Sequence, residues 1–434
     1  MANRKRPCNH GRAARPGRDT TAMVYAILHA SGNGNSVHSD DNMIGVRPSP
    51  ELTLLLACDL SGGAALQAAA GAVPVGFDWD RFGHLAFAHD MAGIVGARLV
   101  PLVGEAMPAG LAEELTTLRR SEVAMSMTQL ELTARLTRAL DASGIAAIIL
   151  KGAALGHLLY APCPEWRNSL DIDILVSPDQ RERAEAVLLG AGLTCGDPAG
   201  RVPLRGRAMR LLLQNAGDFI VPHSGQLVEL HHRICRNPYW LSAPFDALLG
   251  QSVVLETAYG PIRSLTGPVL LNYLCWHALA HMGYRLKWFC DLARALRHFA
   301  TPGCVAFAEA GGALRHLELA DAVLARLLPG VDGGMVPAAK PCWNRRAAAI
   351  VADLEDPRDI PTQRSLAGLP AELAFRLFLA RLAPGGRARA FELLDLTSDP
   401  RDAAVLGLGP RFAPLYAALG PFLALRRMTK ARRA

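Results

Sequence analysis

Short apolar runs and longer amphipathic stretches alternate in the middle of this chain, and they predict a mixed region of helices and strands. Apolar residues recur at helical intervals over residues 121–141. Residues 145–150 form a short apolar run with β-branched members, which predicts a buried strand, and residues 170–176 predict a second one. The Ser-Pro-Asp-Gln that follows gives an N-cap and a proline at the first helical position, so it predicts a helix over residues 177–190.

Both flanks of this region are predicted to be helical. Residues 52–120 and the chain from residue 305 onward are rich in Ala and Leu at helical spacing, with Gly and Pro breaks. Residues before 46 lack periodicity, which predicts a disordered basic tail, with a later start of translation as the alternative. We therefore expect an α+β fold with a small mixed sheet, divided into a tail (1–45), an N-terminal helical region (46–120), an α/β core (121–265) and a C-terminal helical domain (266–434).

Two aspartates interrupt the apolar run of the second predicted strand. Asp171 and Asp173 are two positions apart, so both side chains leave the same face of a strand while the isoleucines beside them enter the core. Adjacent carboxylates repel each other unless a cation lies between them, which favours a divalent metal site over a solvated edge strand. Upstream, Lys151 and Gly152 begin a turn into a helix, where backbone N–H groups can receive a phosphate.

These motifs carry a resemblance to a known family. Lys151-Gly152, Arg167, Asp171-Ile-Asp173 and Val228-Glu-Leu-His231 match, in order, the signature of an uncharacterised bacterial branch of the polymerase-β-like nucleotidyltransferase superfamily. The resemblance is sharp between about residues 145 and 295. Two departures stand out: Ala153 lacks the hydroxyl that often follows the glycine, and the interval from Gly152 to Asp171 is longer than the superfamily norm.

The resemblance implies a set of site residues. It implies that Asp171, Asp173 and Glu229 hold Mg²⁺ or Mn²⁺, with Glu229 also a candidate base toward the acceptor. Glu229 and His231 alternate with apolar residues, which places them on one face of a strand; Asp218 is the alternative third carboxylate. The residues expected to bind the nucleotide are Lys151, Gly152, Ala153 and Arg167. Lysine and arginine there would neutralise and clamp phosphate, although a surface salt bridge is the simpler alternative for each.

A second group of polar residues follows in the C-terminal half. His277 and His281 lie about 40° apart on a helix, and Asp291 falls about 40° to the other side of His277 if that helix is unbroken. Together with His231 and Lys287 we interpret these residues as a structural or substrate-contacting patch. A second metal site is the alternative, but Ala278 stands where a metalloprotease helix would need glutamate.

Composition narrows the class of protein. Hydrophobic residues make up 50% and charged residues 20% of the chain, which is typical of a globular protein. The net charge of +7 is partly carried by arginines and lysines at both ends, for which solvated tails are a simpler explanation than a bound polyanion. The 9 cysteines include no Cys-x-x-Cys pair, so we expect reduced thiols in the cytoplasm. No apolar run approaches the ~20 residues of a membrane span, and no secretory signal is visible.

The resemblance implies an enzyme, a Mg²⁺-dependent nucleotidyltransferase that moves a nucleoside monophosphate from an NTP such as ATP to an acceptor. A small molecule or peptide, as in a natural-product gene cluster, is the expected acceptor, and a protein comes next. The alternative is a nucleotide-binding or regulatory protein that keeps the fold without catalysis. An RNA-directed transferase is weaker, because no combined aromatic and basic surface can be identified in the sequence.

Overall fold

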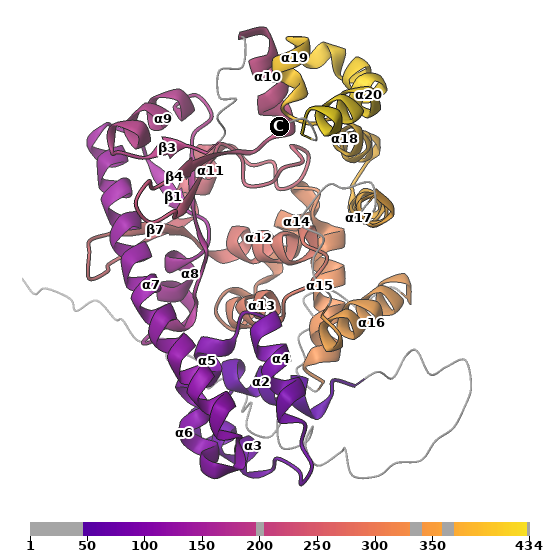
Figure 1. The fold of residues 1–434 in the computed structure, drawn as a ribbon. Coiled ribbons are helices and arrows are strands. Elements are labelled where there is room, and N and C mark those ends of the chain that lie inside the picture. Colours follow the sequence, from indigo (N-terminus) through magenta and orange to yellow (C-terminus); the bar gives the residue numbers. More distant parts are fainter. Residues whose placement is uncertain (1–46, 197–203, 330–340, 358–368, 432–434) are drawn as a thin grey trace, which may run out of the picture.

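A mixed β-sheet lies between the long helix α7 and the C-terminal helices (Figure 1). The computed structural model describes residues 47–196, 204–329, 341–357 and 369–431. The predicted tail, residues 1–45, lies outside these ranges. Helices flank the sheet on both faces, so the fold is α+β, as the sequence predicts.

The sheet has seven strands in the order β3-β4-β5-β2-β1-β7-β6. The strands are β1 (Ala147–Ile149), β2 (Asp171–Val176), β3 (Thr194–Cys195), β4 (Ala216–Ile220), β5 (Leu227–His231), β6 (Ser252–Leu255) and β7 (Ile262–Leu265). Strand β2 runs parallel to β5 and β1 runs parallel to β7, while the other pairs are antiparallel. The predicted strands at 145–150, 170–176 and 227–231 therefore form neighbouring positions at the centre of one mixed sheet.

The N-terminal region is helical, as predicted. Its elements are α2 (Pro50–Leu60), α3 (Gly63–Gly71), α4 (Trp79–Ala88), α5 (Ala92–Arg98), α6 (Val100–Val103), the 3₁₀ turn η3 (Gly104–Ala106) and α7 (Ala109–Ala142). Helix α7 includes the predicted helix over residues 121–141 but begins earlier. Its first half packs against α5, and its second half packs on the sheet. One helix thus joins the N-terminal helices to the sheet.

Four shorter helices lie between or after the strands. They are α8 (Ala153–Leu159), α9 (Arg181–Gly190), α10 (Leu204–Leu213) and α11 (Phe245–Gly250), with the 3₁₀ turn η4 (Pro164–Trp166) before β2. The expected start of α9 at Ser177 and Pro178 is wrong. The Ser177 hydroxyl donates to the Asp179 carboxylate instead of capping a helix, and residues 177–180 form a turn closed by a Gln180 N–H to Ser177 carbonyl bond.

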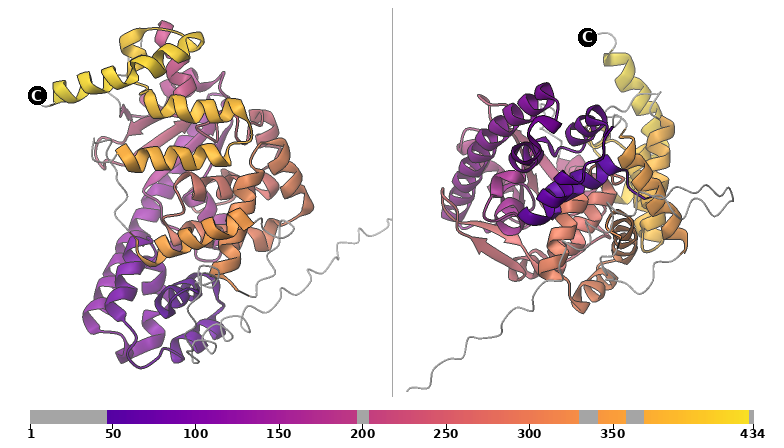
Figure 2. Two further views of the ribbon diagram at one scale, coloured as in Figure 1. Left: turned by 90° about the vertical axis from the view of Figure 1, so that its right-hand side faces the viewer. Right: turned by 90° about the horizontal axis from the view of Figure 1, so that it is seen from below.

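The C-terminal part consists of successive helices that gather on one side of the sheet, opposite α7 (Figures 1 and 2). They are α12 (Gly267–Ala280), α13 (Leu286–Phe299), α14 (Pro302–Ala310), α15 (Leu314–Leu327), α16 (Pro341–Glu355), α17 (Leu369–Leu382), α18 (Gly386–Thr397), α19 (Asp402–Leu406), the 3₁₀ turn η6 (Pro410–Phe412) and α20 (Ala413–Ala431). None of the described helices combines the length and the apolar composition needed to cross a bilayer.

The two faces of the sheet meet different apolar cores. Ile172, Ile174 and Leu230 point to one face and pack with residues of α7 and α9. Ile148 and Leu175 point to the other face and join the larger core of the N-terminal helices and α12–α15. Because side chains alternate along a strand, the residues of β2 and β5 that lie between Ile172, Ile174 and Leu230 have side chains on the opposite face, toward the C-terminal helices. That second face carries the candidate site.

Buried histidines make the fold sensitive to acid. Burial lowers the pKa of four of them below the ordinary value of 6.5. The pKa falls to about 4 for His89 and to about 3 for His232 and His316. The pKa of His277 also lies well below 6.5. Between pH 6.5 and about 4 the unfolded chain therefore binds more protons than the folded protein, and stability falls as the pH falls.

We accordingly expect the melting temperature to drop steeply between pH 7 and pH 5. Each histidine contributes at most about 1.4 kcal/mol per pH unit, a slope that is approached only below pH 6.5. His316→Gln should lower the slope of stability against pH, whereas His84→Gln, at an exposed position, should leave it unchanged. Melting curves recorded by circular dichroism test this, and a melting temperature that is flat from pH 7 to pH 5 would refute it.

Candidate active site

The pairing of three strands brings four carboxylates to one face of the sheet. Asp173 of β2 is in register with Glu229 of the parallel strand β5, and Glu229 is in register with Asp218 of the antiparallel strand β4. Asp171 lies two residues before Asp173 and so shares its face. We call Asp171, Asp173, Glu229 and Asp218 the acidic row. Sequence reasoning gave the first three as the site and Asp218 as a substitute, whereas the register makes Asp218 a neighbour of Glu229.

Lys151 lies over one end of the acidic row. Its ammonium nitrogen is 3.0 Å from Oδ2 of Asp173 and 3.9 Å from Oδ2 of Asp171. The backbone places it there, because Leu150 N–H donates to the carbonyl of Asp173 at 3.1 Å. Burial by itself lowers the pKa of Lys151, but the nearby Asp173 and Asp171 outweigh burial and hold that pKa above its usual value. Lys151 is therefore a fixed positive charge between two carboxylates.

His231 joins Asp173 and Glu229, the two middle members of the row. Its Nε2 lies 3.0 Å from Oδ1 of Asp173 and 3.1 Å from Oε2 of Glu229, while its Nδ1 lies 3.1 Å from the side-chain amide of Asn215. Burial lowers the pKa of His231, but the hydrogen bonds to Asp173 and Glu229 prevail and raise it to about 9. The imidazole therefore keeps its proton on Nε2 near neutral pH and donates it to both carboxylates. In the charged form Asn215 must turn its amide oxygen, and not the nitrogen that lies 3.1 Å away, toward Nδ1–H.

Asp173 is the most enclosed member of the row. Its side chain is 1% exposed, and burial raises its pKa. Lys151 and His231 lower that pKa by more than burial raises it, so the net shift is downward. Oδ2 of Asp173 is buried, and its partner is the Lys151 ammonium at 3.0 Å. A carboxylate oxygen in that position is stabilised by positive charge, which the Lys151 ammonium supplies.

The donor set fits a divalent cation. One ligand atom from each of Asp173, Glu229 and His231 lies within 4.8 Å of the others, which is the only such group of three among the described residues. Carboxylate oxygens are the ligands that Mg²⁺ and Mn²⁺ prefer, and Asp173 and Glu229 supply them here. His231 can bind a metal only after Nε2 loses its proton, which the bonds to Asp173 and Glu229 oppose, so the carboxylates are the metal candidates and His231 lies beside them. The sequence suggested His231 only as a patch residue.

The turn at Gly152 is fastened to the acidic strand. Gly152 has φ +59°, and a Cβ there would come 3.3 Å from Cβ of Ser169. The Ser169 hydroxyl donates to Oδ1 of Asp171 at 2.9 Å. Glycine at position 152 therefore meets two needs, a left-handed backbone and close approach to the loop before β2. Ala153 begins α8, whose first turn carries no side-chain cap. Whether these amides hold phosphate stays a prediction.

Arg167 and Lys287 lie in a buried network of charges, in which each forms an ion pair with an aspartate. Nε of Arg167 lies 2.8 Å from both carboxylate oxygens of Asp291, and Tyr160 donates to the same carboxylate. Lys287 forms an ion pair with Asp90, and burial followed by the charge of Arg167 lowers the pKa of Lys287 to about 8. These pairs fasten α13 to the N-terminal helices and to the loop before β2, so the phosphate role of Arg167 stays a prediction.

The expectation that Asp291 continues the helical stripe of His277 and His281 is wrong. Helix α12 ends at Ala280, and Met282 and Gly283 turn the chain with φ values of 57° and 72° before α13 begins. A Cβ at Gly283 would also come 2.8 Å from Ile350, so the break is built into the packing. Asp291 therefore lies on a separate helix and pairs with Arg167.

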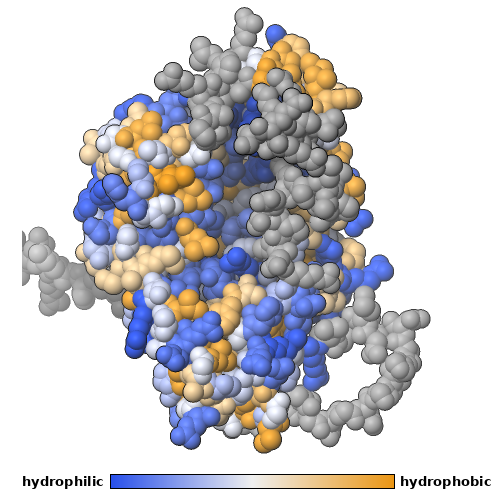
Figure 3. All heavy atoms as spheres, viewed as in Figure 1, coloured by the Kyte–Doolittle hydropathy of each residue, from blue (hydrophilic) through white to orange (hydrophobic). Residues whose placement is uncertain are grey.

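His277 and His281 instead belong to an aromatic group that adjoins the acidic row. Their rings lie 4.8 Å apart, and Trp288 lies 5.2 Å from His277 and 5.1 Å from His281. After burial, the charge of Lys151 is the next cause that lowers the pKa of both histidines, and Asp171 and Asp173 act on His281. The charges of the row and of Lys151 are thus among those that act on this end of α12. Figure 3 shows hydrophilic residues lining a recess between the sheet and the C-terminal helices.

Comparison with known proteins gives one match. A family model described as "Uncharacterised nucleotidyltransferase" matches residues 76–329, which include the whole sheet and the acidic row. No curated protein and no solved structure matches the chain. The match covers more than half of the chain, and the chain therefore belongs to this nucleotidyltransferase family.

Proposed function

We propose that this member of the nucleotidyltransferase family transfers a nucleoside monophosphate from a nucleoside triphosphate, with ATP among the candidates, to a small-molecule or peptide acceptor. The acidic row would bind Mg²⁺ or Mn²⁺. The observation that supports this most strongly is the single sheet face shared by Asp171, Asp173 and Glu229, with Lys151 at 3.0 Å from Asp173. Carboxylates in a row beside a fixed cation suit a polyanion held through a divalent metal.

The proposed reaction forms a bond between an acceptor oxygen or nitrogen and the α-phosphorus. The bond from the α-phosphorus to its bridging oxygen breaks, and pyrophosphate leaves with the electron pair. When bound, the divalent cation supplies charge neutralisation at the triphosphate and at the leaving pyrophosphate. The proton of the acceptor passes to a carboxylate of the protein. Glu229 is the candidate base, because its side chain is 29% exposed whereas that of Asp173 is 1% exposed.

The two cations around the row have different tasks in this scheme. Lys151 offers its ammonium to the triphosphate, which replaces the aspartates as its anionic partner. His231 is protonated near neutral pH, since its pKa is about 9 through its bonds to Asp173 and Glu229, so it orients Glu229 and does not act as the base. Gly152 and Ala153 would present backbone N–H groups to phosphate.

Label transfer tests which bond breaks. With α-labelled nucleotide and Mg²⁺, we expect the label to appear in the acceptor, or in nucleoside monophosphate when water accepts, and γ-labelled nucleotide should give labelled pyrophosphate. Asp171→Asn, at a partly exposed position, should abolish both products. Release of labelled inorganic phosphate from γ-labelled nucleotide, at the same rate in Asp171→Asn, would refute nucleotidyl transfer by this site.

A nucleotide-binding protein without catalysis is the second candidate. It is favoured by Ala153, which lacks a hydroxyl, and by the neutralisation of the row by Lys151 and His231. The label experiment separates the candidates, because this one predicts metal-dependent binding of nucleotide with no pyrophosphate formed.

A further inference from the structure

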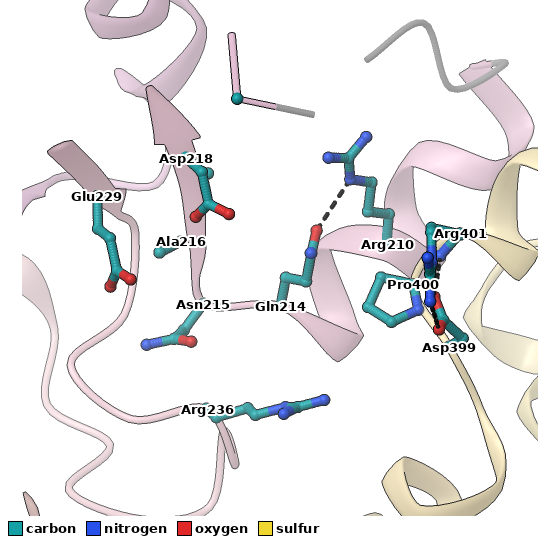
Figure 4. A pocket seen from close by; sticks show the side chains of 12 residues that line it. Arg210, Gln214, Asn215, Ala216, Asp218, Glu229, Arg236, Asp399, Pro400 and Arg401 are labelled. Atoms are coloured by element: carbon teal, nitrogen blue, oxygen red, sulfur yellow. Dashed lines mark hydrogen bonds and ion pairs between the residues drawn. The ribbon is translucent and has the colours of Figure 1, made fainter. Parts of the chain in front are cut away.

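A polar cleft opens at the end of the acidic row farthest from Lys151. Its volume is about 490 Å³, and Asp218 and Glu229 form part of one wall. The opposite wall comes from α10 and from the segment between α18 and α19, far away in the sequence (Figure 4). Helices α10, α19 and α20 share a small apolar core around Met209 and Tyr416, which holds that segment over the edge of the sheet. The cleft is therefore a fixed feature of the fold.

The wall opposite the carboxylates carries arginines. Arg210 and Arg401 lie across the cleft from Asp218 and Glu229 in Figure 4, and Arg236 lies at its floor. Each guanidinium is oriented by a neighbour. Nε of Arg210 donates to Gln214 at 2.9 Å, and Arg236 pairs with Asp395. Arg401 donates to both oxygens of Asp399, a carboxylate that also lines the cleft, at 2.9 and 2.7 Å. Guanidinium groups held in fixed directions recognise carboxylate and phosphate groups.

We propose that this cleft binds the acceptor, and that the acceptor is a small molecule bearing a carboxylate or phosphate. The inference rests on the proposed function. In an in-line displacement the attacking and leaving atoms lie on opposite sides of the phosphorus. Lys151 marks the phosphate end of the row, so the acceptor approaches from the Glu229 end, where the cleft lies.

Size and charge together define the ligand class. The cleft lies within the range of about 300–1,000 Å³ that small-molecule pockets occupy, which suits a metabolite or the end of a peptide. Its anionic group would bind the arginine wall while its hydroxyl or amine reaches Glu229. Asp218, in register with Glu229, would accept a hydrogen bond from the same end of the ligand.

Glycerol 3-phosphate, which carries a phosphate and free hydroxyls, is a suitable probe, with neutral glycerol as its counterpart. Calorimetry of the wild type with Mg²⁺ should detect glycerol 3-phosphate but not glycerol. In Arg210→Gln/Arg401→Gln the affinity for glycerol 3-phosphate should fall at least tenfold while the affinity for Mg²⁺–NTP stays unchanged. Arg207→Gln is the matched control, because Arg207 lies on α10, pairs with Glu182 and does not line the cleft.

Several outcomes would overturn the inference. Equal affinity for the probe in the arginine variant and the control would do so, as would absence of probe binding or binding of an RNA oligonucleotide in its place. Loss of Mg²⁺–NTP affinity in the arginine variant would assign the cleft to the nucleotide. Each of these results leaves the proposed function standing if α-label transfer persists. Failure of the wild type to bind or cleave any Mg²⁺–NTP would instead refute the proposed function itself.

Discussion

Replacing Asp173 by asparagine is expected to abolish nucleotidyl transfer and to destabilise the protein at the same time. Asp173 is 1% exposed and neutralises two buried cations, Lys151 and His231, at 3.0 Å each. Its loss leaves a buried lysine with only the more distant Asp171, and breaking a buried ion pair of this kind costs about 3–5 kcal/mol. The rate should fall by at least about 10²–10³-fold, as when one preorganised charge-stabilising group is removed.

A second substitution separates the two effects. In Asp173→Asn/Lys151→Met the unpaired buried ammonium is gone, so urea unfolding should show most of the lost free energy restored while transfer stays absent. Asp171→Asn, with a side chain 29% exposed, should abolish transfer with little loss of stability. If Asp173→Asn were as stable as the wild type, the ion pairs around Asp173 would not have the role that we assign to them.

Glu229→Gln is expected to reduce turnover by about 10²–10⁴-fold, the usual contribution of a general base. The affinity for Mg²⁺–NTP should fall only modestly, because Asp171 and Asp173 remain. Single-turnover kinetics with α-labelled nucleotide measure the chemical step, and calorimetry measures the binding.

Asp218→Asn is the matched variant, since Asp218 faces Glu229 across the β4–β5 ladder and shares its side of the sheet. Its effect on the chemical step should be much smaller than that of Glu229→Gln. The reverse result, a normal rate in Glu229→Gln and a lost rate in Asp218→Asn, would transfer the role of third carboxylate to Asp218.

The alternation of polar and apolar residues within single strands predicted which carboxylates share a face, and the resemblance to the family singled out Glu229 among them. Asp171, Asp173 and Glu229 each stand between apolar neighbours, and period-two alternation determines the face that they share. Strand β2 pairs with β5, and both carry a buried apolar face.

Other parts of the site depend on contacts that local patterns do not encode. Arg167 and Lys287 find their carboxylate partners 124 and 197 residues away, so a sequence pattern could not distinguish them from phosphate ligands. The break after α12 comes from Met282 and Gly283 in left-handed conformations, which periodicity alone did not predict. The arginine wall of the cleft combines α10 with the segment before α19, and only the tertiary fold brings these together.

The acidic row as a divalent-metal site for nucleotide is the central claim, and calorimetry tests it most directly. Wild type and Asp171→Asn would each be titrated with ATP, GTP, CTP and UTP, with Mg²⁺ and with excess chelator. We predict that at least one nucleotide binds the wild type with Mg²⁺ and that binding weakens at least tenfold on chelation or in Asp171→Asn. Affinity that is equal with and without Mg²⁺ and in both proteins would contradict the claim.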